Sequence, residues 1–185
     1  YALTQTLYAA PLVKLFGFSF TLLRLTTIFM GWVTVCFTAF TARELGLPNR
    51  SAILAALTVF VNPLFINLSY TFMTDVPFCA FASISVYWFV KSLRNPSTTT
   101  IFLGALFSVC GFYNRQFGAA IPIAFVLAIA LNGYLVRTNR QHITAFLLPG
   151  CAGLFIVFIP VLGPDQIIVD RPVNSTWRGL YATAL

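Results

Sequence analysis

The residues most able to do chemistry lie in one short stretch between two long apolar segments. Asp75 follows Thr74 there, in the run NPLFINLSYTFMTDVPF. The chain has only four acidic residues, and an acid beside apolar segments is costly unless it caps a helix, pairs with a cation or contacts a substrate. We expect Thr74 or Asp75 to cap the helix that follows, with Pro77 in its first turn. Such a cap would also hold the carboxylate toward a polar ligand or a metal ion.

Basic residues form the second candidate group. Arg115, in YNRQFG, lies at the end of an apolar block where topology requires no positive charge, and its guanidinium could bind a phosphate in bidentate fashion. The alternative is an arginine that snorkels to the membrane interface. Gln116 could assist by hydrogen bonding. With Lys14 and Arg24, Arg115 would form a collar of three cations around the acid, suited to a lipid-linked phosphate, although each alone is also explained as a membrane anchor.

The composition shows what kind of scaffold must position these residues. The chain is 59% hydrophobic and 16% aromatic, with 8% charged residues, whereas a soluble domain carries roughly a quarter. The apolar residues form continuous blocks, which is typical of helices that face lipid or one another. The net charge of +7 comes from basic residues that stand singly between these blocks, as topogenic signals do. We therefore expect an integral membrane protein and no nucleic-acid partner.

The spacing of the blocks predicts an all-α polytopic bundle of about six spans. Their lengths bracket the roughly 17–25 residues that cross a bilayer, with the fourth shortest. Basic connections alternate with the connections that hold Asp75 and Arg115, so the positive-inside rule places the basic ones in the cytoplasm and these two residues outside. A break is expected at Asn62-Pro63, inside the second block. The six blocks run from about Leu22 to Ala42, Ser51 to Leu68, Pro77 to Leu93, Thr100 to Tyr113, Ala119 to Val136 and Ile143 to Gly163.

Three regions follow from this pattern. Residues 1–20 contain Thr, Gln, Lys and Pro11 among apolar residues, which favours a helix lying in the outer interface rather than a span. Residues 21–163 form the transmembrane bundle, and residues 164–185 are an outer loop at the start of a further region. Since the chain opens at Tyr1 without a signal peptide, we interpret it as an internal fragment, part of whose active site lies elsewhere.

Several motifs in this order resemble a known family. They are Tyr8-Ala9-Ala10-Pro11-Leu12, LFGFSFTLLRLTTIFMGWVTV, TARELGL, NPLFINLSYTFMTDVPF and YNRQFGAAIPIAF. Together they resemble the membrane glycosyltransferases of the C fold, and most of all the dolichyl-phosphate-mannose protein mannosyltransferase and aminoarabinose transferase (ArnT-like) group. The resemblance extends to about Gly163. One departure is that the doubled proline of the family pattern is Ala10-Pro11 here.

The resemblance implies a hexosyltransferase-like enzyme of the outer membrane face. It would move a sugar from a polyprenyl-phosphate donor to a protein, lipid or glycan acceptor, with inversion. The family places its main catalytic acids in an outer loop before the aromatic-Pro-Leu segment, upstream of this chain. What carries over is the Thr74-Asp75 pair as a supporting acid and Arg115 as a contact to the donor phosphate, with Lys14 and Arg24 as further basic residues. Asp75 could position sugar or acceptor, or help hold a divalent ion.

Two other functions fit the same residues. A secondary transporter could line its substrate path with Asp75 and Arg115, but such proteins often carry paired broken helices, and Asn62-Pro63 has no clear counterpart. A non-catalytic assembly subunit would respond to Asp75→Asn or Arg115→Ala in stability and not in activity. For the membrane, we expect the bacterial plasma membrane in preference to the endoplasmic reticulum.

Overall fold

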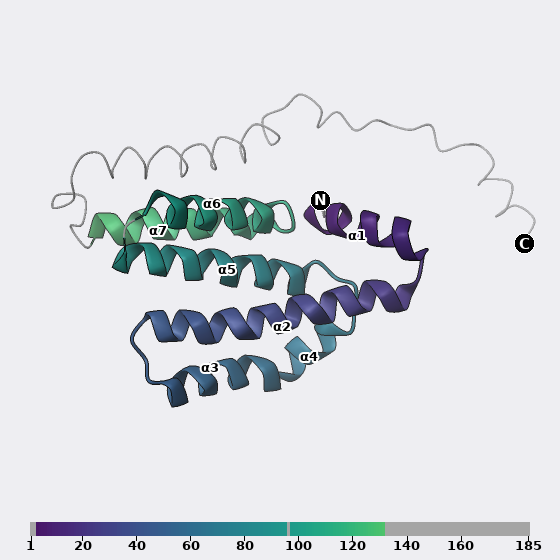
Figure 1. Cartoon of the computed structure of the whole chain (residues 1–185), viewed down its shortest axis with the longest axis horizontal. Helices are drawn as coiled ribbons and strands as arrows, with labels where there is room; N and C mark the ends of the chain where they lie inside the picture. The colour runs from purple at the N-terminus through teal and green to yellow at the C-terminus, as the bar shows by residue number, and fades with distance from the viewer. Residues whose placement is uncertain (1–2, 96, 132–185) are drawn as a thin grey trace, which may run out of the picture.

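The described part of the chain is built from helices. The computed structural model describes residues 3–95 and 97–131, which form seven α-helices and one short 3-10 helix, labelled in Figure 1 apart from the 3-10 helix. In chain order these elements are α1 (Leu3–Phe16), α2 (Phe20–Glu44), α3 (Asn49–Val61), α4 (Pro63–Ser69), α5 (Asp75–Arg94), α6 (Thr98–Phe112), η1 (Gln116–Ala119) and α7 (Ala120–Leu131).

The longer helices lie side by side (Figure 1). Helix α2 contacts α3 on one side and α5 on the other, and α6 and α7 pack against α5. Helix α1 lies beyond the end of α6, near the start of α2 (Figure 1). It ends at Phe16, and Gly17 then adopts a φ of 78°, a left-handed conformation that glycine reaches without a Cβ penalty. This turn sends the chain back along α2.

Small and hydroxyl-bearing residues let α2 approach its neighbours closely. A Cβ on Gly31 would lie 3.1 Å from the Ser69 Oγ and 3.5 Å from Val76, so α4 and α5 both close on this point of α2. Thr27 and Thr34 are buried in α2, and their hydroxyls donate to carbonyl oxygens of the preceding turn. Such internal hydrogen bonds suit an apolar surrounding, where helices associate through small residues and no water satisfies a free hydroxyl.

The register of α5 against α6 and α7 is fixed by three contacts. The Ser85 hydroxyl donates to the Gly104 carbonyl oxygen over 2.7 Å and is fully buried. A Cβ on Gly104 would lie 2.7 Å from the Phe89 ring, so only glycine permits this crossing. On its other side the Phe89 ring stacks on Phe125 of α7 at a centroid distance of 4.1 Å. These contacts determine which residue at the end of α6 lies level with the start of α5.

The all-helical prediction is confirmed for the described residues, but six spans are not. Two helices, α2 and α5, are long and apolar enough to cross a membrane, and the bent pair α3–α4 would be a third. Helices α6 and α7 are apolar but shorter. The expected break at Asn62-Pro63 is confirmed as a 63° bend, where Asn62 Oδ1 accepts hydrogen bonds from the backbone N–H groups of Leu64 and Phe65. The sixth block and the region 164–185 lie outside the described residues.

Charged residues lie at both ends of the bundle, as expected from the alternation of basic connections with those that hold Asp75 and Arg115. The ends of α2 and α5 meet through Glu44 and Arg94, whose nearest charged atoms are 3.8 Å apart. Asp75 begins α5 and therefore lies at the other end of that helix. Which end faces the cytoplasm stays a prediction.

Candidate active site

Asp75 is placed by the start of α5. The helix begins at this residue, with Pro77 in its first turn, where a missing backbone N–H costs no hydrogen bond. A carboxylate in the first turn is also stabilised by the helix dipole. Thr74 occupies the cap position as expected, but the expected side-chain cap is absent: the Thr74 backbone is helical (φ −74°, ψ −12°), and its hydroxyl makes no cap hydrogen bond. The Thr74 hydroxyl is therefore available to another partner.

Arg115 is placed by the turn that follows α6. Its backbone N–H donates to the Gly111 carbonyl oxygen over 2.8 Å, and its own carbonyl oxygen accepts from Gly118 N–H over 2.9 Å. The buried Ser108 hydroxyl donates to the Gly118 carbonyl oxygen over 3.1 Å, which holds η1 against α6. Gly118 packs on the α6 backbone so closely that an added Cβ would lie 2.7 Å from Phe112 Cα. The arginine thus projects from a short and well-anchored segment.

These two segments bring three of the predicted site residues together. Arg115 Nη2 lies 2.7 Å from Asp75 Oδ1, and Arg115 Nε points to the Thr74 hydroxyl at 3.5 Å, the outer limit of a hydrogen bond. Thr74 and Arg115 are 41 positions apart in the sequence. The Arg115 and Asp75 side chains keep 42% and 27% of their exposure, so a ligand can reach both charges.

Two buried polar groups, the Asn114 amide and the Tyr8 hydroxyl, were missed by the sequence reasoning. Asn114 precedes Arg115 and retains only 3% of its exposure, yet neither its Oδ1 nor its Nδ2 has a hydrogen-bond partner among the described residues. The Tyr8 hydroxyl is likewise buried and has no hydrogen-bond partner in the part of the chain that the structure describes, and burial raises the pKa of Tyr8 to about 12. Thr4, one turn before Tyr8, donates to the Cys110 carbonyl oxygen over 2.9 Å and so ties α1 to the end of α6. Because an unpaired buried polar group is costly, each of these groups is a candidate contact for a ligand.

The other predicted site residues form no ion pair with Asp75 or Arg115 in the described part of the chain. Lys14 and Arg24 are exposed, and neither forms an ion pair within residues 3–95 and 97–131, so the three-cation collar stays a prediction. Gln116 is exposed and begins η1, directly after Arg115. Among the described residues, no group of three or more His, Cys, Asp and Glu side chains gathers, so those residues alone do not form a site for a divalent ion.

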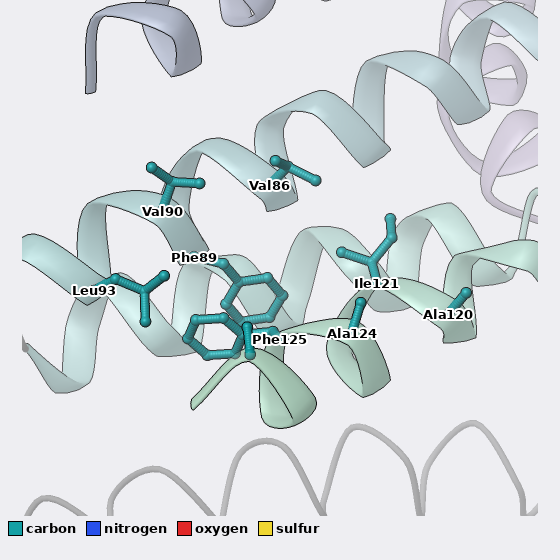
Figure 2. A pocket seen from close by; sticks show the side chains of 9 residues that line it. Val86, Phe89, Val90, Leu93, Ala120, Ile121, Ala124 and Phe125 are labelled. Atoms are coloured by element: carbon teal, nitrogen blue, oxygen red, sulfur yellow. The ribbon is translucent and has the colours of Figure 1, made fainter. Parts of the chain in front are cut away.

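An apolar groove lies along α5, the helix that Asp75 begins (Figure 2). It has a volume of about 400 Å³ and lies between α5 and α7, with the Phe89–Phe125 stack in its wall. Its end at Ala120 follows Arg115 by only a few residues of chain. The residues that line it are all apolar: Val86, Phe89, Val90, Leu93, Ala120, Ile121, Ala124, Phe125 and Ala128. The groove can bind a hydrocarbon chain but offers no group for chemistry.

Comparison with protein families identifies the chain. Residues 6–163 match the family model described as dolichyl-phosphate-mannose-protein mannosyltransferase. The protein belongs to this family. Membership indicates a membrane glycosyltransferase and agrees with the resemblance found in the sequence motifs. No curated protein and no solved structure matches the chain. The segment from Thr74 to Arg115 lies within the matched range, so the ion pair belongs to the part of the chain that the family shares.

Proposed function

We propose that the protein transfers a sugar from a polyprenyl-phosphate donor to an acceptor at the outer, periplasmic or lumenal, membrane face. Family membership supports the transferase class, and the Asp75–Arg115 pair at the end of α5 is the observation that supports the site. Departure of the phosphate builds negative charge on its oxygens, which a fixed guanidinium stabilises. The family name points to a mannosyl phosphate donor of the dolichyl type.

Arg115 is the proposed contact to the donor phosphate. Its Nη2 and Nε face Asp75 and Thr74, and no partner within the described ranges engages Nη1. A guanidinium held on one side by a carboxylate keeps its orientation while its remaining N–H groups bind phosphate oxygens. Asp75 thus acts as a supporting acid that orients Arg115, and its second oxygen is available to the acceptor hydroxyl or the sugar.

The buried amide of Asn114 is the proposed contact to hydroxyl groups of the sugar. An amide carries both donors and an acceptor, which suits the alternating character of sugar hydroxyls. Replacement by leucine, whose side chain has the same number and branching of heavy atoms, separates two explanations. If nothing binds Asn114, removal of an unsatisfied buried amide leaves stability unchanged or raised and transfer intact. If the sugar binds there, Asn114→Leu keeps the thermal stability and lowers transfer roughly tenfold.

The isoprenoid chain of the donor is proposed to lie in the groove between α5 and α7. The groove is apolar along its length, and its Ala120 end is close in the chain to Arg115, the proposed phosphate contact. A lipid phosphate could therefore place its charge at the ion pair and its hydrocarbon in the groove.

The direct test measures release of polyprenyl phosphate from radiolabelled polyprenyl-phosphate mannose. The full-length protein is assayed in membranes that contain its natural acceptors. Arg115→Ala is expected to lower the release roughly tenfold or more, whereas Arg50→Ala, which removes an exposed cation in the first turn of α3, leaves it unchanged. Wild-type release by purified Arg115→Ala would remove this residue from the site. A transporter or an assembly subunit, neither of which family membership favours, would show no release at all.

A further inference from the structure

A polar cavity lies at the end of the bundle opposite Asp75. It has a volume of about 380 Å³ and forms where the last turns of α2 and α5 meet. Its walls come from two elements, with Phe40, Arg43 and Glu44 on α2 and with Tyr87 and Arg94 on α5. No residue of the candidate active site takes part, so this cavity needs an explanation of its own.

The charge of this cavity is positive. The Arg94 guanidinium lies 3.8 Å from the Glu44 carboxylate, and the Arg94 side chain is 56% exposed. Arg43 is exposed and has no ion-pair partner in the part of the chain that the structure describes. Two guanidinium groups and one carboxylate therefore line the cavity. Lys91 adds a third cation beside it, because its Nζ lies 3.5 Å from the hydroxyl oxygen of the lining residue Tyr87. An anion is the ligand that this balance favours.

The aromatic wall supplies both an apolar surface and a hydrogen-bond donor. The rings of Phe37, Phe40 and Tyr87 pack in one cluster, with centroid distances of 5.4 to 6.2 Å. Lys91 Nζ donates to the Tyr87 hydroxyl oxygen over 3.5 Å, so the hydroxyl proton remains available to a ligand. Aromatic residues at the ends of membrane helices lie at the level of lipid headgroups, with an apolar body and a polar tip.

We propose that this cavity binds the headgroup of an anionic phospholipid from the leaflet opposite the candidate active site. The guanidinium groups of Arg43 and Arg94 and the Tyr87 hydroxyl would bind the phosphodiester oxygens, since guanidinium groups match phosphate geometry. The ring of Phe40 would contact the first carbons of the glycerol and acyl chains. The bound lipid would hold the ends of α2 and α5 together, where the direct Glu44–Arg94 contact is long and contributes little by itself.

The test measures which lipid stays on the protein. Full-length protein is purified in detergent, loaded with phosphatidylglycerol or phosphatidylethanolamine, and examined by native mass spectrometry. We expect the wild type to retain phosphatidylglycerol roughly tenfold better than the double variant Arg43→Gln/Arg94→Gln. Arg50→Gln is the matched control, because it removes the same charge from the first turn of α3, and Arg50 does not line the cavity. It should retain phosphatidylglycerol as the wild type does.

Several results would overturn this proposal. If Arg50→Gln loses as much phosphatidylglycerol as the double variant does, the lipid is attracted by overall charge and not by this cavity. If the double variant retains as much phosphatidylglycerol as the wild type, the cavity is not the binding site. Equal retention of phosphatidylethanolamine would contradict the charge argument, and displacement of the lipid by millimolar inorganic phosphate would point to a simple anion site. Tyr87→Phe, which removes only a hydroxyl, should weaken retention in a protein that folds normally. Since retention is measured without sugar transfer, its outcome is independent of the proposed transferase function.

Discussion

The ion pair between Arg115 and Asp75 can be tested by a double-mutant cycle. Two unit charges about 4 Å apart near a protein surface attract by about 4 kcal/mol at an effective dielectric constant of about 20. The 42% and 27% exposure of the side chains screens this attraction, and exposed pairs contribute about 1 kcal/mol or less to stability. Each single variant, Arg115→Ala and Asp75→Asn, should therefore lower the thermal stability only slightly.

Transfer should fall much more than stability. Loss of a fixed donor from a site that stabilises developing negative charge costs about 10²-fold in rate, or about 2.7 kcal/mol. If Asp75 acts by orienting Arg115, the two residues form one unit, and the double variant should be little worse than Arg115→Ala alone. The assay is release of polyprenyl phosphate from the mannosyl donor by the full-length protein, with membrane insertion measured in parallel. Losses that multiply in the double variant would refute the orienting role of Asp75, and unchanged transfer in either single variant would refute the site.

Three further predictions follow from other parts of the structure. Gly118→Ala puts a Cβ against the α6 backbone and should push η1 and Arg115 away, so that transfer falls at least roughly tenfold in an enzyme assay while the protein still inserts. Ala124→Phe fills the apolar groove and should raise the KM for the lipid donor severalfold, whereas Leu127→Phe, which does not line the groove, should not. Burial raises the pKa of Tyr8 from 10.0 to about 12, so the unfolded chain loses this proton first, and stability should fall as the pH rises from about 10 to about 12. Melting curves of the wild type and Tyr8→Phe across this range should diverge, and parallel curves would contradict the buried phenol.

Local signals in the sequence predicted much of the fold. The Asn62-Pro63 break became a bend because proline cannot continue the hydrogen-bond ladder and asparagine caps the next helix. The start of α5 at Asp75 follows from the same kind of local preference. The expected side-chain cap at Thr74 fails because its backbone is helical rather than extended, and its hydroxyl lies instead 3.5 Å from Arg115 Nε. A local rule could not reveal this partner.

Contacts between distant segments could not be derived from the sequence. The approach of Arg115 to Asp75 depends on the register of α6 against α5, which the close fit of Gly104 on Phe89 determines. The burial of Asn114 depends on the packing around the end of α6 in the same way. Periodicity and composition indicate that helices exist, and they do not specify how far one helix slides along its neighbour.

The charged pair belongs to a single helical hairpin. Asp75 opens α5, Arg115 follows α6, and these two helices are consecutive in the chain. In evolution the pair can therefore be inherited as one unit, and insertions between α2 and α3 would leave its geometry intact. A residue added inside α6 after Gly104 is different, because it would move the end of α6 by about 1.5 Å relative to the fixed contact with Phe89 and separate the charges. We expect related proteins to vary freely in length between α2 and α3 and very little within α6 after Gly104.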